Sequence, residues 1–408
     1  MDKMIGFAVV ICTIVMLVHF YVGRRLISPS GMKKPLRVAA WITLYIMAFL
    51  LLAGPVMDRI YTSPPKPMWL NALIWVSFTQ MGIMVLVFLG LLIKDLFRLG
   101  KKLYQFSNGK FKKTEAGEGE QTEDINISRR TFMINGANLG IIGASTGLAG
   151  FGAGVAIGEP TIERVSIEVN NLPAGLEGMK IAQISDMHIG PTLKRDFTEM
   201  VVRTVNELKP DIIAVTGDLI DGYVDVLKHD TEPFKDLSAK YGTYYVTGNH
   251  EYYWGVRPWL KEVERLGMTV LSNESRIIST SNGDLLLAGV TDYESERFTP
   301  DEASSPLKAI SQNQHKKADY KILLAHQPRS CFEAAKVGFN LQLSGHTHGG
   351  QFVPWNYLVK LQQPFVEGLD LYKDLLVYTN RGTGYWGPPI RIGVPSEISL
   401  LTLVSKKA

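Results

Sequence analysis

The stretch Gly345-His346-Thr347-His348-Gly349-Gly350-Gln351 places two of the chain's eight histidines one residue apart in a glycine-rich turn. An apolar run, residues 339–343, leads directly into it. Residues i and i+2 of an extended backbone point the same way, so both imidazoles can reach one site or two adjacent metal ions. The glycines allow a sharp turn and a close approach to a bound ion. Because an isolated His-x-His pair also fits an exposed polar turn, its interpretation depends on the residues upstream.

Five apolar runs in the C-terminal part of the chain each end in residues that can bind a metal ion. The runs over 178–185, 212–215, 244–246, 322–325 and 341–343 predict buried strands, and amphipathic helices are predicted over 194–208 and 258–266. In open α/β sheets, ligands gather beyond the carboxyl ends of strands. The pattern predicts one site that is formed by Asp186, His188, Asp218, Asn249, His250, His326, His346 and His348.

The mixture of strands and helices predicts an α/β architecture with a layered core. Further strands are expected over 162–169, 268–271, 276–279, 285–290, 375–379 and 397–403. The chain has only two cysteines, Cys12 and Cys331, which excludes a structural zinc site built on thiolates and implies no disulfide framework.

The predicted site combines two aspartates, one asparagine and five histidines, a set that suits Mn, Fe or Zn. These ligands are too many for one ion, whereas two ions that share a bridging carboxylate would use them fully. Such a pair of ions can generate a hydroxide nucleophile at neutral pH and clamp a phosphoryl group for in-line attack. A histidine outside the coordination sphere could then protonate the leaving oxygen.

These motifs, together with the closing segment 380–398, resemble the calcineurin-like metallophosphoesterase superfamily. Within it they resemble the membrane-associated bacterial branch, which includes twin-arginine-exported phosphoesterases and is similar to some UDP-diacylglucosamine hydrolases. The resemblance covers about Thr161–Val404. It implies a metal-dependent phosphoric ester hydrolase whose fold is a β-sandwich flanked by helices. The fold class expected for the whole chain is α/β, with N-terminal transmembrane helices before this domain.

The resemblance also implies a role for each residue of the motifs. Asp186, His188 and His348 would hold a first metal ion, and Asp218 would bridge the two ions as a catalytic residue. The second ion would be held by Asn249, His326 and His346, and His250 would be the leaving-group acid or a phosphate contact. For two further residues, Glu251 and Arg381, two interpretations remain open. Glu251 either orients His250 or is a surface charge, and Arg381 either contacts the substrate phosphate or forms a structural salt bridge.

The first 160 residues hold the excess of apolar residues that brings the hydrophobic share of the chain to 46%. Residues 5–22, 38–56 and 69–93 are long and apolar enough to span a bilayer. Residues 136–158 are rich in glycine and alanine, which fits close helix packing in a membrane, with a mobile tether as the alternative. We therefore predict a membrane anchor of three or four helices with a basic cytoplasmic linker in residues 1–158, and the phosphoesterase domain in residues 159–408.

Basic residues predict the orientation of this anchor. They are concentrated in the loops after the first and third apolar segments, and such loops stay in the cytoplasm. The phosphoesterase domain is then extracytoplasmic if the fourth segment spans the membrane, and cytoplasmic if it does not. Ser128-Arg129-Arg130-Thr131-Phe132 resembles a twin-arginine export signal and favours the first case. The acidic stretch 114–126 reads as a flexible linker. The predicted location is the inner (plasma) membrane.

We therefore predict a membrane-anchored dimetal phosphoesterase that hydrolyses a phosphomonoester or phosphodiester, including lipid-linked ones, by metal-activated hydroxide. One alternative is a nucleotide phosphodiesterase, and another is a membrane sensory or binding protein with a regulatory phosphoesterase domain. The modest net charge of +4 is not gathered into a basic stripe in the C-terminal part, so no nucleic acid polymer is expected as a partner.

Overall fold

The computed structural model describes residues 2–64, 66–108, 120–313 and 318–406, and it divides into two compact units. The first, which we call the helical unit, comprises residues 1–60 and 68–151. The second comprises residues 61–67 and 152–408, and we call it the catalytic unit because it contains the segment that resembles the phosphoesterases. Each unit is described by itself.

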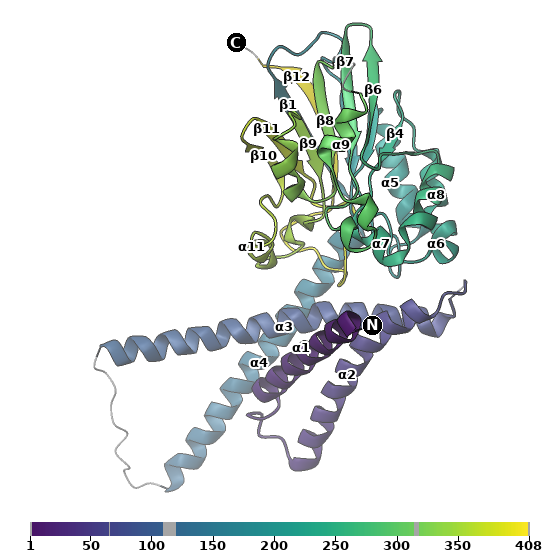
Figure 1. Ribbon diagram of the computed structural model, residues 1–408. Helices are drawn as coiled ribbons and strands as arrows, with labels where there is room; N and C mark the ends of the chain where they lie inside the picture. The colour runs from purple at the N-terminus through teal and green to yellow at the C-terminus, as the bar shows by residue number, and fades with distance from the viewer. Residues whose placement is uncertain (1, 65, 109–119, 314–317, 407–408) are drawn as a thin grey trace. The chain divides into compact units, whose positions relative to one another are not determined.

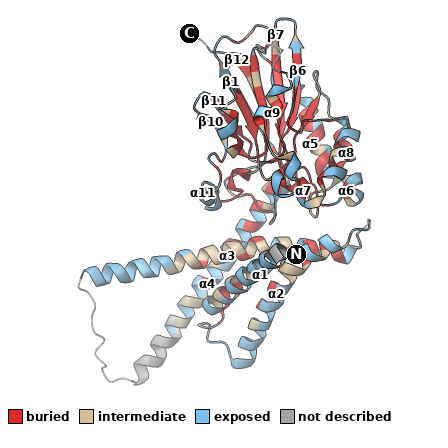
Figure 2. Cartoon of the chain, viewed as in Figure 1, coloured by how far each residue is buried: buried red, intermediate tan, exposed pale blue. Residues whose placement is uncertain are grey.

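The helical unit is built from α1 (Asp2–Leu26), α2 (Lys34–Ile60), α3 (Met68–Ser107) and most of α4 (Glu120–Ile157), all of which are labelled in Figure 1. All four helices are long and apolar enough to cross a membrane, the fourth over Thr131–Ile157. Many of their large apolar side chains are exposed, as Figure 2 shows for α1, α2 and α3. A water-soluble protein would bury most of these side chains, whereas lipid would cover them at no cost.

Polar side chains connect the helices inside this unit. Gln80 of α3 donates to the carbonyl of Met47 on α2 at 2.7 Å, and Ser77 donates to the carbonyl of Leu50 at 2.6 Å. Such interhelical hydrogen bonds are typical of helices that pack in a membrane.

The acidic stretch before the fourth apolar segment differs from expectation. Residues 114–119 lie outside the described residues, but α4 already begins at Glu120, where a linker without helix was expected through Asn126. Residues 120–127 contain neither glycine nor proline, so this stretch of the sequence holds no residue that breaks a helix.

The catalytic unit contains two six-stranded sheets. The first has the strand order β1-β12-β2-β3-β4-β5, in which β2, β3, β4 and β5 are parallel and β12 runs antiparallel to β2. Its strands are β1 (Thr161–Val169), β2 (Lys180–Ile184), β3 (Ile212–Val215), β4 (Thr243–Tyr245), β5 (Thr269–Val270) and β12 (Glu397–Ser405).

The second sheet has the order β10-β11-β9-β8-β7-β6, in which β7, β8, β9 and β11 are parallel and both edge strands are antiparallel to their neighbours. Its strands are β6 (Glu274–Thr280), β7 (Gly283–Gly289), β8 (Tyr320–Leu324), β9 (Leu341–Ser344), β10 (Gly368–Tyr372) and β11 (Leu375–Thr379). The expected strands over 276–279, 285–290, 322–325, 341–343 and 375–379 all coincide with strands of this sheet to within two residues.

Apolar side chains hold the two sheets together and cover both outer faces. Ile181, Ile212, Leu285, Ile322 and Leu401 belong to the buried cluster between the sheets. Further clusters pack helices against each sheet. The helices of the unit are α5 (Arg195–Glu207), α6 (Val224–Thr231), α7 (Asn249–Trp254), α8 (Val256–Arg265), α9 (Pro306–Ser311), α10 (Cys331–Ala334) and α11 (Trp355–Val359), with short 3₁₀ segments η1 (Glu232–Asp236), η2 (Ser295–Arg297), η3 (Pro300–Glu302), η4 (Pro328–Ser330) and η5 (His348–Gly350). The expected sandwich flanked by helices is confirmed.

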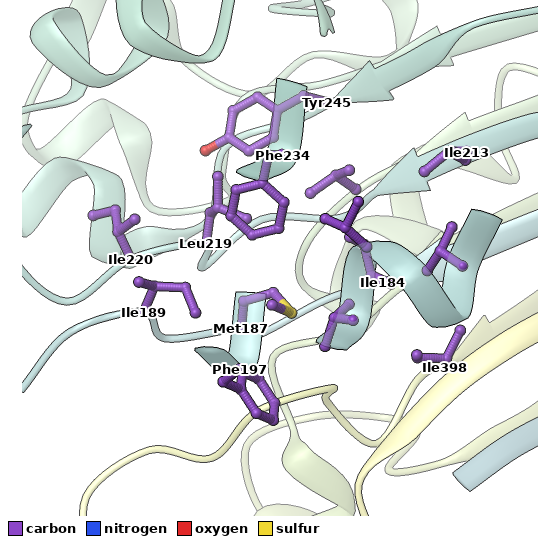
Figure 3. Packing of buried hydrophobic residues seen from close by; sticks show 14 of the residues in the cluster. Ile184, Met187, Ile189, Phe197, Ile213, Leu219, Ile220, Phe234, Tyr245 and Ile398 are labelled. Atoms are coloured by element: carbon purple, nitrogen blue, oxygen red, sulfur yellow. The ribbon is translucent and has the colours of Figure 1, made fainter. Parts of the chain in front are cut away.

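The cluster that packs helices against the first sheet also anchors the loops that follow β2 and β3. Met187, Leu219 and Ile220 are fully buried and pack with Ile184 and Phe197 (Figure 3). Met187 lies between Asp186 and His188 in the sequence, and Leu219 follows Asp218. Apolar residues next to the polar ones therefore enter the core and fix the polar side chains at the carboxyl end of the sheet.

Candidate metal centre

The loop after β2 and the turn after β9 meet in a first group of possible ligands, Asp186, His188 and His348. The Nε2 atoms of the two histidines lie 3.1 Å apart, and His348 Nε2 lies 3.4 Å from Asp186 Oδ1. The backbone N–H of His346 donates to both carboxylate oxygens of Asp186, at 3.1 and 2.9 Å. The His-x-His turn is therefore tied directly to the Asp-x-His loop of the other sheet.

A second group contains Asp218, His326 and His346. Nε2 of His326 lies 3.2 Å from Asp218 Oδ2 and 3.1 Å from Nδ1 of His346. The other ring nitrogen of His326 lies 2.8 Å from the carbonyl oxygen of Thr216, which can only accept a hydrogen bond. Nδ1 of His326 is therefore a protonated atom, and Nε2 is the ring atom that faces the group.

Asn249 supplies a further unsatisfied oxygen. Its side chain is buried, and its Oδ1 has no hydrogen-bond partner in the described structure. A buried amide oxygen without a partner is costly, so such an atom calls for an explanation. An amide oxygen also accepts a divalent cation, and the donors gathered here therefore fit metal ions of the Mn, Fe or Zn type.

Asp218 stands between the two groups. Its Oδ2 lies 3.8 Å from Nε2 of His188, which belongs to the first group, and 3.2 Å from Nε2 of His326. Its other oxygen, Oδ1, accepts the backbone N–H of His250 at 2.9 Å. One carboxylate oxygen thus faces histidines of both groups while the other is used to hold the side chain in place.

The backbone at this centre is held in a conformation that side chains rarely adopt. Asp186, His188, Asp218, His346 and His348 all have positive φ, between 46° and 70°. Such positions cost about 1–3 kcal/mol each and cluster at functional sites. Two positions require glycine because a carboxylate oxygen of the centre lies too close to the backbone to leave room for a Cβ atom. A Cβ on Gly248 would lie 2.2 Å from Asp218 Oδ1, and one on Gly345 would lie 2.2 Å from Asp186 Oδ2.

Asp221, which the sequence patterns did not indicate, connects two of the histidines. Its Oδ2 lies 3.0 Å from His188 Nδ1, and its Oδ1 is hydrogen-bonded to His250 Nδ1. This arrangement leaves the Nε2 atoms of both rings directed towards Asp218, each at 3.8 Å from Oδ2. The only feature of the sequence that could have indicated Asp221 is its position as a second carboxylate three residues after Asp218, on the same loop.

Burial and neighbouring charges set the ionisation of the centre. Burial raises the pKa of the Asp218 carboxyl, but the attraction of His326 and His250 outweighs it and brings this pKa well below its ordinary value. Burial lowers the pKa of His346 to about 3 and that of His348 well below its ordinary value. Burial opposes protonation of His250 too, but Asp221 and Asp218 raise its pKa to about 9. An ionised Asp218 and neutral His346 and His348 are the forms that bind metal.

Glu251 has neither of the two roles considered for it from the sequence. Its side chain is fully buried and accepts three backbone N–H groups, from Gly248 at 2.7 Å, Leu219 at 2.8 Å and Asp218 at 3.1 Å. It occupies the third position of α7, a common capping position, and α7 itself was not expected from the sequence. Glu251 therefore joins the loops that carry Asp218 and Asn249.

Replacing Glu251 by glutamine is expected to lower the melting temperature of the full chain by several degrees. The amide NH2 of glutamine would face N–H donors, and each buried donor left unpaired costs about 1–3 kcal/mol. Thermal unfolding in detergent measures the change. The exposed Glu264 of α8 provides the control Glu264→Gln, which should leave the melting temperature within about a degree because surface changes are usually small. Equal melting temperatures for the two variants would contradict the structural role of Glu251.

The closing segment supports the centre through Arg391, and Arg381 lies outside it. Arg391 is fully buried, and its guanidinium donates to the carbonyls of Arg381 at 2.8 Å, Gly382 at 3.1 Å and His348 at 3.4 Å. Arg381 pairs instead with Glu397 at 2.6 Å and Glu163 at 3.1 Å. The guanidinium of Arg381 is thus engaged by two carboxylates.

The chain is similar to known phosphoesterases over most of its length. The family model for the calcineurin-like phosphoesterase matches residues 179–350. An uncharacterized metallophosphoesterase of Helicobacter pylori is 37% identical over 290 residues, which covers 69% of this chain and 74% of the relative. A transmembrane protein with metallophosphoesterase domain from Danio rerio is 32% identical over 372 residues, which covers 89% and 80%.

The Danio rerio relative also extends the similarity beyond the domain that the family model matches, into the region of apolar helices. These helices and this relative indicate that the protein associates with a membrane. The identity with both relatives, over most of each, shows the family to which the chain belongs. The chain belongs to the calcineurin-like phosphoesterases and is a metal-dependent phosphoesterase.

Proposed function

We propose that this protein is a membrane-anchored phosphoesterase that binds two divalent metal ions and hydrolyses a phosphomonoester or phosphodiester, with lipid-linked phosphoesters as the preferred class. The observation that carries the proposal is the position of Asp218, which faces histidines of both ligand groups within 4 Å. A carboxylate in this place suits two ions that share one ligand.

The proposed ligands follow from the two groups. Asp186, His188 and His348 would hold the first ion, and Asn249, His326 and His346 the second, with Asp218 shared. Bound divalent ions supply Lewis acidity and lower the pKa of a water nucleophile. Mn, Fe and Zn all fit this mixture of imidazole and carboxylate.

His250 is proposed as the residue that moves a proton. Asp221 holds its Nδ1, so its Nε2 faces Asp218 at 3.8 Å. In the reaction, a water molecule gives one proton to the solvent, the resulting hydroxide oxygen forms a bond to phosphorus, and the bond between phosphorus and the leaving oxygen breaks. Nε2–H of His250 then donates its proton to the leaving oxygen. Asp221 acts as a positioning residue because it fixes the ring without touching the reacting atoms.

The location of the substrate follows from the anchor. We propose that residues 1–158 hold the protein in the inner (plasma) membrane, with the catalytic domain, residues 159–408, on the extracytoplasmic side. The twin-arginine-like sequence around Arg129 and the basic loops after the first and third helices support this orientation. An enzyme held at a bilayer meets lipid-linked phosphoesters in two dimensions, which favours them over soluble ones.

Metal analysis and a substrate panel test this proposal together. We expect about two Mn, Fe or Zn ions per purified chain and metal-dependent hydrolysis of aryl phosphate esters. A panel of lipid-linked phosphoesters and soluble nucleotides, compared at equal phosphorus concentration, separates the substrate classes. Metal-free protein that stays inactive after addition of Mn²⁺ would contradict the catalytic proposal and favour a sensory or binding role. A preference for nucleotides would contradict the lipid-linked substrate only.

A further inference from the structure

A short segment of the catalytic unit carries a group of exposed apolar side chains that no core accounts for. Val353, Trp355, Tyr357, Leu358 and Leu361 all lie within nine residues and are all exposed, Leu361 to 85%. None of the five residues of α11 is buried. We call residues 353–361 the α11 segment. Large apolar groups gathered on one surface segment mark a contact with a partner or a membrane.

The α11 segment is attached directly to the metal centre. It follows η5, which contains His348, and a Cβ on Gly350 would lie 2.3 Å from Cα of Asn356. Between them, Gln351 donates from its side-chain amide to the carbonyls of Trp386 and Pro388, each at 3.1 Å. The ring of Trp386, which is itself exposed, lies 5.7 Å from that of His250. Whatever binds the α11 segment therefore lies close to Trp386, whose ring contacts His250 of the centre.

The end of α4 is connected to the start of the α11 segment by backbone hydrogen bonds. The last turn of α4, from Gly152 to Ile157, belongs to the catalytic unit, and the carbonyl of Gly152 accepts the backbone N–H of Arg391 at 3.0 Å. The next residue, Ile392, donates its backbone N–H to the carbonyl of Gln351 at 3.2 Å and forms a bridge with Phe352. Only two residues of the closing segment thus separate the end of α4 from the start of the α11 segment.

If α4 crosses a membrane, its continuation into the catalytic unit implies that the membrane surface lies near Gly152. The candidate span of α4 begins at Thr131, and a bilayer core is crossed in about 20 residues of helix. A span that starts there leaves the hydrocarbon core near Phe151, one residue before the hydrogen bond to Arg391. The composition of the α11 segment agrees, because Trp and Tyr are enriched at the interface between hydrocarbon and headgroups. The exposed Lys360 adds a positive charge, which suits anionic headgroups.

We propose that the α11 segment is a membrane-docking surface that lies in the interfacial layer of the bilayer that α4 crosses. Trp355, Tyr357, Leu358 and Leu361 enter the boundary between headgroups and acyl chains, and the exposed Trp386 beside His250 is held near the lipid surface. The docking follows from exposure and chain continuity, and it does not depend on the substrate named above.

Spin labels at two positions of the α11 segment test this docking in the full chain. Leu358→Cys and Leu361→Cys are each made with Cys12→Ser, because Cys12 is the exposed native cysteine and Cys331 is buried. The labelled chains are reconstituted in vesicles of phosphatidylcholine and phosphatidylglycerol. Continuous-wave power saturation then compares collisions with oxygen, which concentrates in lipid, and with a water-soluble nickel chelate. Leu307→Cys on α9, also exposed, is the matched control.

We expect the labels at 358 and 361 to collide more with oxygen than with the nickel chelate, and the label at 307 to show the reverse. Labels at 358 and 361 that are as open to the nickel chelate as the control would overturn the proposal. Labels shielded from both reagents would also overturn it, because a second copy or the chain's own helices would then cover the segment. A wild-type protein without hydrolytic activity would contradict the proposed function. It would not affect the collision rates of the spin labels, which test the docking alone.

Discussion

Replacing Asp218 by asparagine is expected to reduce kcat/KM for an aryl phosphodiester on the order of a thousandfold, about 4 kcal/mol of transition-state stabilisation. The change removes the negative charge that faces histidines of both ligand groups, at 3.8 Å from His188 and 3.2 Å from His326. The asparagine retains an oxygen that can accept the backbone N–H of His250, so the loop should keep its shape. Steady-state kinetics and the metal content per chain are measured together.

The control for this variant is Asp301→Asn, which removes a carboxylate from the exposed segment η3. It should keep both activity and metal content. A twofold or smaller loss of kcat/KM in Asp218→Asn, with metal content unchanged, would show that this carboxylate is not a shared ligand. Loss of folding would be recognised from thermal unfolding, and Asp218→Glu would then test whether the charge alone restores metal binding.

His250→Asn is expected to show a loss of activity that depends on the leaving group. A proton from Nε2 matters most when the leaving oxygen is a strong base, so hydrolysis of an alkyl phosphodiester should fall by roughly 10²–10⁴-fold. Hydrolysis of a nitrophenyl phosphodiester, whose leaving oxygen needs less help, should fall much less. The comparison uses kcat for both esters with the same enzyme preparation.

His229→Asn is the control for this variant, because the side chain of His229 is 79% exposed on the catalytic unit. It should leave both rates unchanged. Equal losses for the two esters in His250→Asn would contradict the role of proton donor and favour a contact between His250 and the substrate phosphate. The proposed metal ligands are unchanged in His250→Asn, so we expect the variant to bind as much metal as the wild type in either case. Metal analysis of the variant would verify this.

The sequence predicted the main strands and the set of polar residues at their ends for a simple physical reason. Buried strands of a sandwich are continuous apolar runs, and the parallel ones must deliver their carboxyl ends to a common edge. The loops after β2, β3 and β4 and those after β8 and β9 therefore had to meet, and the structure brings Asp186, Asp218 and His346 together as expected. Their roles as ligands stay predictions that the metal analysis tests.

Residues that act through backbone contacts were beyond the reach of sequence patterns. Glu251 and Arg391 work by accepting or donating to main-chain groups of distant loops, and no periodicity encodes these contacts. Asp221 was visible only as one more acidic residue after β3. The short helices α6 and α11 were also missed, because one or two turns give too few repeats to reveal a periodic pattern.

The strand order of the first sheet has a consequence for the synthesis of the protein. Strand β12 lies between β1 and β2 and pairs with both. The first strand of the catalytic unit, β1, therefore has no partner in this sheet until β12 has been synthesised. Local pairing can begin early, but closure of this sheet joins residues more than 230 positions apart, as Val165 and Leu401 illustrate. The ribosome must therefore release β12 before this sheet can close, and until then β1 has no partner in it.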